Sequence, residues 1–257
     1  TKTMVSNQDM SSLNDFPSYN DWTKNTGADW TTKNNFSESA VTNLTKTVGL
    51  KDPVQYSVAV LQSTVKCDAA TLKDNGQSKG GLKADQDVPV NSGFPVTGIL
   101  IGGQPESVDW KYEPAATGES FANTIYDKEM NGAPMYAKNE ANASNANYTL
   151  VFDNKNAPNK VVFVTIELEN NSGMDFYGQD GIIPKDAKFY LVGKLDPTGK
   201  TESDHVFVQD HITKANFNIK TLKGAYNCIP DLRTSGINVG LAVDLSWQTG
   251  ITFNVDL

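Results

Sequence analysis

Residues 160–169 read KVVFVTIELE, and the spacing of their apolar residues indicates the fold. From Val162 onward every second residue is aliphatic, a period of two that is typical of a β-strand with one buried face. Val162, Val164 and Ile166 share one face. Glu167 and Glu169 share the other, where they could act as a carboxylate pair for glycoside hydrolysis. Their place opposite the aliphatic row instead predicts that they lie on the solvated side of a sheet.

Nine further stretches rich in β-branched and aromatic residues, separated by turn residues, also predict strands. They are residues 54–67, 96–102, 107–113, 147–153, 187–195, 205–209, 214–220, 237–247 and 250–256. Ten strands suit two packed sheets better than one, so we expect an all-β chain that folds as an antiparallel β-sandwich. The other residues expected to face inward are Val58, Val60, Tyr190 and Val192.

Residues 1–52 have a different composition, rich in Asn, Asp, Ser and Thr. Asn35 and Glu38 have the spacing of a capping box, which predicts a helix that ends at Gly49. We expect a second short helix at residues 222–226, ended by Pro230. The predicted organisation is therefore a loop-rich N-terminal segment with a short helix (1–52) and a β-sandwich (53–257). The sandwich is either a whole domain or the C-terminal part of a longer precursor.

The charge of the chain excludes some partners. The formal net charge is −8, with a pI near 4.8, and no basic run is present. A phosphate backbone or an anionic membrane surface would be repelled, so we expect no nucleic acid as partner. No apolar run reaches the length of a membrane-spanning segment, and no signal peptide is visible. Because residue 1 is Thr, we expect a mature form or an excised piece of an exported protein.

Motifs of catalysis and cofactor binding are missing from the sequence. It contains no P-loop, dinucleotide-binding glycine pattern, nucleophile elbow or zincin helix. The two histidines, His205 and His211, flank a predicted short strand and would lie about 20 Å apart along it. That separation argues against a shared metal ion. We therefore expect no enzyme activity, no metal site and no cofactor.

Two pairs of residues remain open to more than one interpretation. Cys67 and Cys228 are either two free thiols or one disulfide, and in either case we expect both to be shielded. Trp22 and Trp30 lie among polar neighbours, where they could stack on a ligand such as a sugar ring. Buried aromatic anchors are the commoner alternative for tryptophans in a sandwich.

Four stretches of residues 54–257 resemble the fimbrillin superfamily of Bacteroidales surface proteins. They are GILIGGQ (98–104) leading to VDW (108–110), KFYLVGKL (188–195), AYNCIPDLR (225–233) and GLAVDLSW (240–247). The resemblance implies a transthyretin-like sandwich and lipoprotein export to the cell surface or outer membrane. It also implies a role as the shaft, tip or anchor subunit of a type V pilus, assembled by strand exchange. The implied partners are other fimbrial subunits, and host or bacterial surface proteins or glycans.

The C-terminal stretch has the pattern of a strand that can join either its own sheet or that of a neighbour. Ile251, Phe253 and Val255 alternate with polar residues and form one apolar row. Strand addition along an open edge needs backbone pairing and such a row to set the register. We therefore predict these three residues as the donor-strand contact between subunits. The alternative function is a non-polymerising surface lipoprotein that binds glycan or protein ligands.

Overall fold

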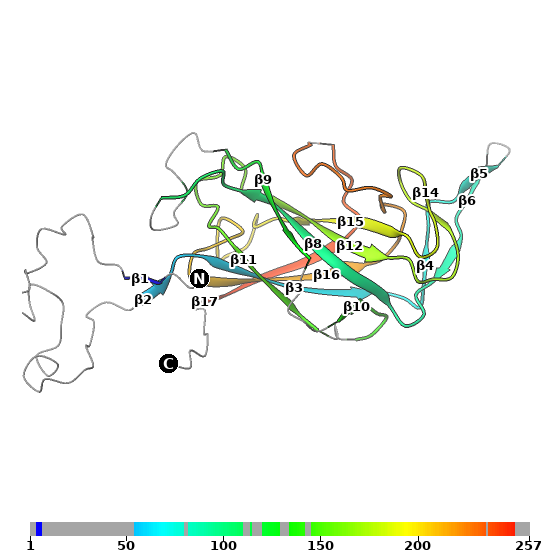
Figure 1. Cartoon of the computed structure of the whole chain (residues 1–257), viewed down its shortest axis with the longest axis horizontal. Helices are drawn as coiled ribbons and strands as arrows, with labels where there is room; N and C mark the ends of the chain where they lie inside the picture. The colour runs from blue at the N-terminus through cyan, green and yellow to red at the C-terminus, as the bar shows by residue number, and fades with distance from the viewer. Residues whose placement is uncertain are drawn as a thin grey trace, which may run out of the picture. The chain divides into compact units, whose positions relative to one another are not determined.

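The computed structural model describes residues 4–6, 54–79, 82–109, 114, 120–128, 134–141, 145–234 and 236–249. The chain divides into two compact units, Thr1–Ser57 and Val58–Leu257. In the first unit, β1 (Met4–Ser6) pairs antiparallel with β2 (Val54–Tyr56). The described part of the second unit forms two main sheets and three two-stranded ribbons (Figure 1).

A five-stranded antiparallel sheet is built around β8 (Phe94–Gln104). β12 (Val162–Glu169) pairs along one edge of β8, and β15 (Lys188–Leu195) pairs with the far side of β12. β9 (Asn123–Asp127) and β10 (Met135–Ala137) both pair with β8, along its other edge. This sheet confirms the antiparallel pairing that the sequence predicts.

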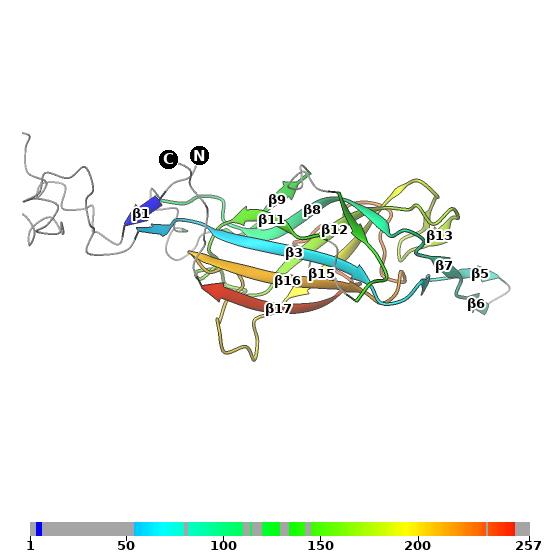
Figure 2. The same ribbon diagram turned by 90° about the horizontal axis from the view of Figure 1, so that it is seen from below.

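The four-stranded sheet is mixed. Its order is β11 (Asn147–Val151), β3 (Ala59–Cys67), β16 (His211–Ile219) and β17 (Ala242–Thr249). β11 and β17 pair antiparallel with their neighbours, whereas β3 and β16 run parallel (Figure 2). Parallel neighbours require a crossover connection, and here the chain between β3 and β16 builds the whole five-stranded sheet. The expectation of purely antiparallel pairing is therefore wrong for this one pair of strands.

Three short ribbons extend from one part of the second unit. They are β4 (Thr71–Lys73) with β7 (Asp87–Pro89), β5 (Gln77–Lys79) with β6 (Leu82–Ala84), and β13 (Phe176–Tyr177) with β14 (Ile182–Ile183). The buried carboxylate of Asp74 joins them. It accepts hydrogen bonds from the backbone N–H groups of Gly76, Gln86 and Tyr177 at 2.7–2.9 Å and from the Gln86 side chain at 3.0 Å.

The core lies between the inner faces of the two sheets. Val162, Val164 and Ile166 of β12 are buried in it, as their alternation predicts. In the same core, Phe189 of β15 packs edge-on against Phe94 and Phe176, with ring centroids 5.3 Å apart in both pairs. Such edge-to-face contacts stabilise a core beyond the burial of apolar area.

The predicted inward faces of β3 and β15 are wrong. Val60 and Val192 are buried but lie outside this core, which instead contains Leu61 and Leu191. Tyr190 lies on the same outer side as Val192, and Val58 is half-buried. Both strands have apolar residues on both faces, so alternation could not show which row meets the second sheet.

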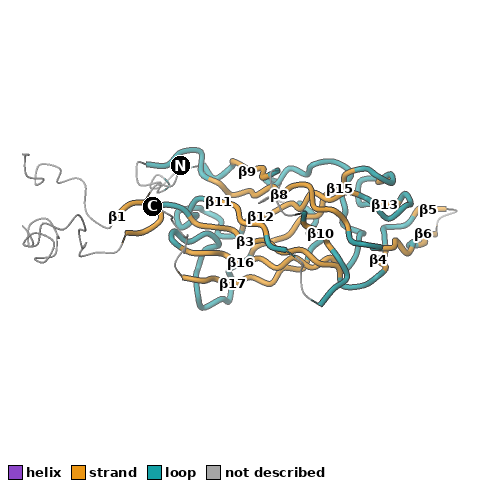
Figure 3. Tube along the Cα trace, turned by 60° about the horizontal axis from the view of Figure 1, so that its bottom comes forward, coloured by secondary structure: helices purple, strands orange, loops and turns teal. Residues whose placement is uncertain are grey.

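No helix is present in the described residues, which are strands and loops throughout (Figure 3). The helix expected at residues 222–226 is wrong, because the chain makes a single turn there and Tyr226 then pairs with the backbone of Tyr190 in β15. The helix expected before Gly49 lies outside the described residues. The described part of the chain has no helix with the length and hydrophobicity that a membrane crossing requires.

Two expected strands are loops. Val108 makes only an isolated bridge with Pro114, so the described part of 107–113 is not a strand. Residues 205–209 are buried at Val206 and Phe207 but form no ladder. There the side-chain oxygen of Asn154 accepts the Phe207 N–H at 2.8 Å, in place of a neighbouring strand. Side chains that bond to the backbone in this way compete with regular secondary structure.

Candidate interaction surfaces

Most of the residues expected to bind a partner lie outside the described part of the chain. These are the donor-strand residues Ile251, Phe253 and Val255, together with Trp22 and Trp30. Their roles stay predictions. The described residues carry other surfaces, which the sequence did not single out.

Cys67 and Cys228 are both free thiols. Cys67 ends β3, is 1% exposed and donates to the Ala137 carbonyl oxygen at 3.2 Å. Burial, and secondly the charge of Asp68, raise the pKa of Cys67 to about 12. Cys228 is exposed in the connection between β16 and β17, with its Sγ 3.5 Å from Asp180 Oδ2. Shielding is thus confirmed for Cys67 and wrong for Cys228, because a surface loop carries the second thiol.

His205 is held between two carboxylates. Its Nδ1 lies 2.6 Å from Asp204 Oδ1, and its Nε2 lies 3.5 Å from Asp153 Oδ1, which is an electrostatic contact rather than a hydrogen bond. Burial would lower the pKa of His205, but the two carboxylates raise it above its usual value. His211 is not part of this cluster, since its ring contacts the Gln209 carbonyl oxygen at 2.8 Å. Among the described residues, no three His, Cys, Asp or Glu side chains converge as metal ligands.

Glu167 is not on a solvated face, contrary to expectation. Its side chain is 1% exposed. Oε1 accepts hydrogen bonds from Thr97 Oγ1 at 2.7 Å and Lys188 Nζ at 2.5 Å, and Oε2 accepts from Tyr126 Oη at 2.6 Å. Burial alone would raise the pKa of Glu167, but these three donors hold it below its usual value. Burial and then the hydrogen bond to Glu167 raise the pKa of Tyr126.

We call the outer side of the five-stranded sheet around Thr97, Tyr126, Glu167, Lys188 and Tyr190 the covered face. The connection between β16 and β17, orange in Figure 1, lies over this sheet. It pairs with the edge of β15 at Tyr226 and again at Gly240 and Leu241. Between these points, Leu232 lies close to Gly102. A Cβ added at Gly102 would be 3.4 Å from the Cβ of Leu232.

We call the outer side of the four-stranded sheet the open face. The strand register sets its side chains in three rows across the strands. The first row is Leu150, Val60, Ile212 and Gln248. The second is Tyr148, Gln62, Lys214 and Ser246. The third is Thr64, Asn216 and Asp244.

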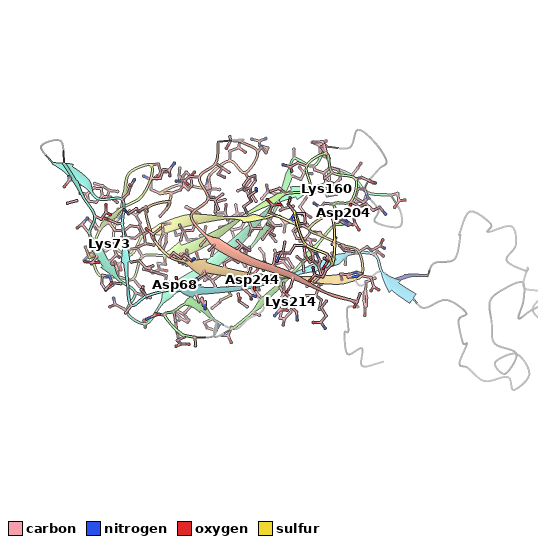
Figure 4. The ribbon with its side chains drawn as sticks, turned by 180° about the vertical axis from the view of Figure 1, so that it is seen from behind. Asp68, Lys73, Lys160, Asp204, Lys214 and Asp244 are labelled. Carbon is pink, nitrogen blue, oxygen red and sulfur yellow. The ribbon has the colours of Figure 1, made fainter. Side chains whose placement is uncertain are left out.

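The open face is hollowed next to its third row. The hollow encloses about 490 Å³ and is lined by side chains that include Thr64, Lys66, Asn216, Lys220 and Asp244. Asp68, Asp244 and Lys214 are labelled on this side of the molecule in Figure 4. Within the described residues, the side chains of Lys66, Lys214, Lys220 and Asp244 have no hydrogen-bond or ion-pair partner. Their charges are therefore available to a ligand.

β11 forms an edge of the four-stranded sheet. It pairs with β3 on one side and with no second strand among the described residues. Its inward residues Asn147 and Thr149 donate to Asp127 Oδ2 at 3.0 and 2.6 Å, which ties this edge to β9. Its outward residues are exposed, Tyr148 by 49% and Leu150 by 55%. The sequence predicted a strand here, but neighbouring strands decide that it is an edge.

No protein-family model matches the chain, and no curated protein matches it. Three solved structures that resemble it are each described as a putative cell adhesion protein. One, from Bacteroides eggerthii DSM 20697, has 12% identity over 79% of this chain and 59% of its own, with a TM-score of 0.40. Two from Parabacteroides distasonis ATCC 8503 have 11% and 8% identity over 80% of this chain, with TM-scores of 0.38 and 0.33. This chain spans 56% and 62% of those two, and so less than two thirds of all three.

Proposed function

We propose that this chain is a structural or adhesive subunit of a bacterial surface fimbria, assembled by strand exchange between subunits. The proposal places the chain outside the cell, at the surface or outer membrane, with other fimbrial subunits as its partners. It assigns the chain no catalytic step. The resemblance of residues 54–257 to fimbrillins suggested this role.

The observation that supports the proposal best is the edge strand β11. Alternate residues of an edge strand direct their N–H and C=O groups away from the sheet, where another chain can pair with them. Natural edges are usually protected by charges, proline or bulges, but the outward residues of β11 are Tyr148 and Leu150. An incoming strand would form backbone hydrogen bonds with β11 and pack its own side chains beside Tyr148 and Leu150.

Two changes in the full-length protein, expressed in cells, test assembly. Deletion of residues 250–257 removes the predicted donor row, and Leu150→Lys places a charge at the edge of β11. Both should leave an exported, folded subunit that gives few or short fibres in electron micrographs. Ile182→Lys is the matched control, because Ile182 is 48% exposed and lies on the β13–β14 ribbon. Fibres of normal length from the deletion would exclude the donor role of residues 250–257, and normal fibres from Leu150→Lys would exclude β11 as the acceptor.

The alternative, a non-polymerising surface lipoprotein that binds glycan or protein ligands, has support from a different observation. The hollow of the open face presents unpaired charged side chains, which strand exchange does not use. The two functions separate on one measurement. A fimbrial subunit forms fibres in cells, and these fibres require residues 250–257 and Leu150. A simple binding lipoprotein stays monomeric at the surface and still binds its ligand.

A further inference from the structure

We propose that the hollow of the open face, together with Tyr148, is a binding site for an acidic oligosaccharide, a chain of sugar rings that carries carboxylate groups. This inference deepens the adhesive part of the proposed function. It uses the hollow and one side chain of β11, Tyr148, but not the backbone edge of that strand, so it does not need strand exchange.

The charge of the site favours an anionic ligand. Lys66 and Lys220 line the hollow, and Lys214 lies in the next row of the sheet. None of the three has an ion-pair partner within the described residues. Among the described residues, Asp244 is the one carboxylate that lines the hollow. The chain as a whole carries a net charge of −8, so this local excess of lysine runs against its average and would attract a carboxylate there.

The uncharged groups of the site suit hydroxyl groups. Thr64 and Asn216 are neighbours across β3 and β16, and the Thr64 hydroxyl donates to Asn216 Oδ1 at 2.6 Å. Asp244 is the next residue in the same row, so the carboxylate of Asp244 lies beside the amide N–H₂ of Asn216. Sugar hydroxyls donate and accept hydrogen bonds, so they can pair with a mixed row of amide, hydroxyl and carboxylate groups.

Tyr148 adds an apolar surface for a sugar ring. It lies across from Gln62 in the strand register, and Gln62 precedes Thr64 of the hollow by two residues on the same face. Residues two apart on a strand are separated by about 7 Å, so the aromatic ring and the hollow can contact successive units of one oligosaccharide. Tyr148 is 49% exposed and therefore accessible to a ligand. An aromatic ring beside convergent polar groups is the usual composition of a ligand site.

The volume of the hollow is consistent with an oligosaccharide. At about 490 Å³ it falls within the range of small-molecule sites. An acidic segment of a second copy of this chain is the competing occupant, because it would satisfy the same lysines. A protein segment would give self-association of the chain, whereas an oligosaccharide would bind to the monomer.

Calorimetric titration of the full chain tests the site with three probes. Hexagalacturonate and 3′-sialyllactose represent the two common acidic sugars, uronic and sialic acid, and maltohexaose is the neutral control. We expect one or both acidic probes to bind in low salt and to weaken as salt screens the lysines. Maltohexaose should bind much more weakly. Absence of binding by both acidic probes, or equal binding of maltohexaose, would overturn the proposal.

Variants then locate the site. Lys66→Gln with Lys214→Gln should weaken the acidic probe about tenfold, and Tyr148→Ala should weaken it about fivefold. Lys200→Gln is the matched control, because Lys200 is exposed in the turn that follows β15.

Equal affinity of all variants would mean that the sugar binds elsewhere. Self-association in ultracentrifugation that the double lysine variant abolishes would assign the face to a second copy instead. A variant that loses sugar binding but forms normal fibres, or one that loses fibres but still binds sugar, separates this proposal from strand exchange.

Discussion

The two sheets share one core, but their outer faces differ in how their carboxylates are exposed and bonded. On the covered face, Glu167 is 1% exposed and all its donors come from the protein. On the open face, Asp244 is exposed and has no side-chain partner among the described residues. The donors of Glu167 belong to strands of its own sheet, β8, β9 and β15, and the connection between β16 and β17 lies over that sheet as well (Figure 1).

The charges of the covered face are structural, whereas those of the open face are available for binding. A buried carboxylate is retained only when donors offset the loss of water, and those donors are then no longer available to a ligand. Asp244 and the lysines Lys66, Lys214 and Lys220 of the open face make no such contacts with the part of the chain that the structure describes. We therefore expect substitutions on the covered face to change stability and substitutions on the open face to change binding.

The largest expected effect is that of Glu167→Gln. Loss of the charge weakens three hydrogen bonds to a buried side chain at once and should lower the free energy of unfolding by about 2 kcal/mol. Glu169→Gln, on the same strand and the same face, should change it by less than about 0.5 kcal/mol, because Glu169 is only partly buried. Chemical denaturation measures both. Equal small losses would mean that the covered face is open to water.

Gly98→Ala tests why Tyr126 can reach Glu167. A Cβ at Gly98 would be 2.7 Å from Tyr126 Cε2, so we expect displacement of the ring and a loss of about 1.5 kcal/mol in the free energy of unfolding. The pKa of Tyr126 should also fall, because the ring leaves its carboxylate acceptor. An ultraviolet titration against Tyr126→Phe measures this shift. Gly236→Ala, whose Cβ would meet no atom within 4 Å, is the control, and an unchanged Tyr126 pKa in Gly98→Ala would contradict the steric argument.

His205→Asn extends the comparison to a second closed cluster and should show a pH dependence. The pKa of His205 is raised in the folded chain, so its contribution is fully present below the unfolded value of about 6.5 and is lost as pH rises through the folded value. The substitution should therefore cost about 1 kcal/mol more at pH 5.5 than at pH 9. Denaturation at both pH values checks it. In an Asp153→Asn background the difference should shrink, and a cost independent of pH would show that His205 acts only by packing.

The smallest expected effects are on the open face. Asp244→Asn and Lys214→Gln should each change the free energy of unfolding by less than about 0.5 kcal/mol, because neither side chain has a hydrogen-bond or ion-pair partner among the described residues. Thermal or chemical denaturation measures this. A loss above 1 kcal/mol from either would mean that the open face is held together by its charges, which would remove the contrast between the faces.

The sequence predicted the type of structure well and its details unevenly. The alternation in 160–169 located β12, its buried face and an all-β fold, because one apolar row faces a core and the other row is polar. The same method failed for Val60, Tyr190 and Val192, since strands with apolar residues on both faces have no distinctive row. The apolar spacing at Leu222 predicts a helix, but it also suits a turn that packs on a sheet edge, which is what forms there.

The sequence by itself determined the strands with clear alternation, the net negative charge and the resemblance to surface proteins, since each depends on residues close together in the chain. The tertiary structure alone decided which face of each sheet is covered, that Glu167 is buried and that β11 is an edge. It also placed Tyr148, Gln62 and Lys214 in one row across the sheet, although Lys214 comes 66 residues after Tyr148 in the chain. These features depend on which distant strands become neighbours, and local residue patterns do not contain that information.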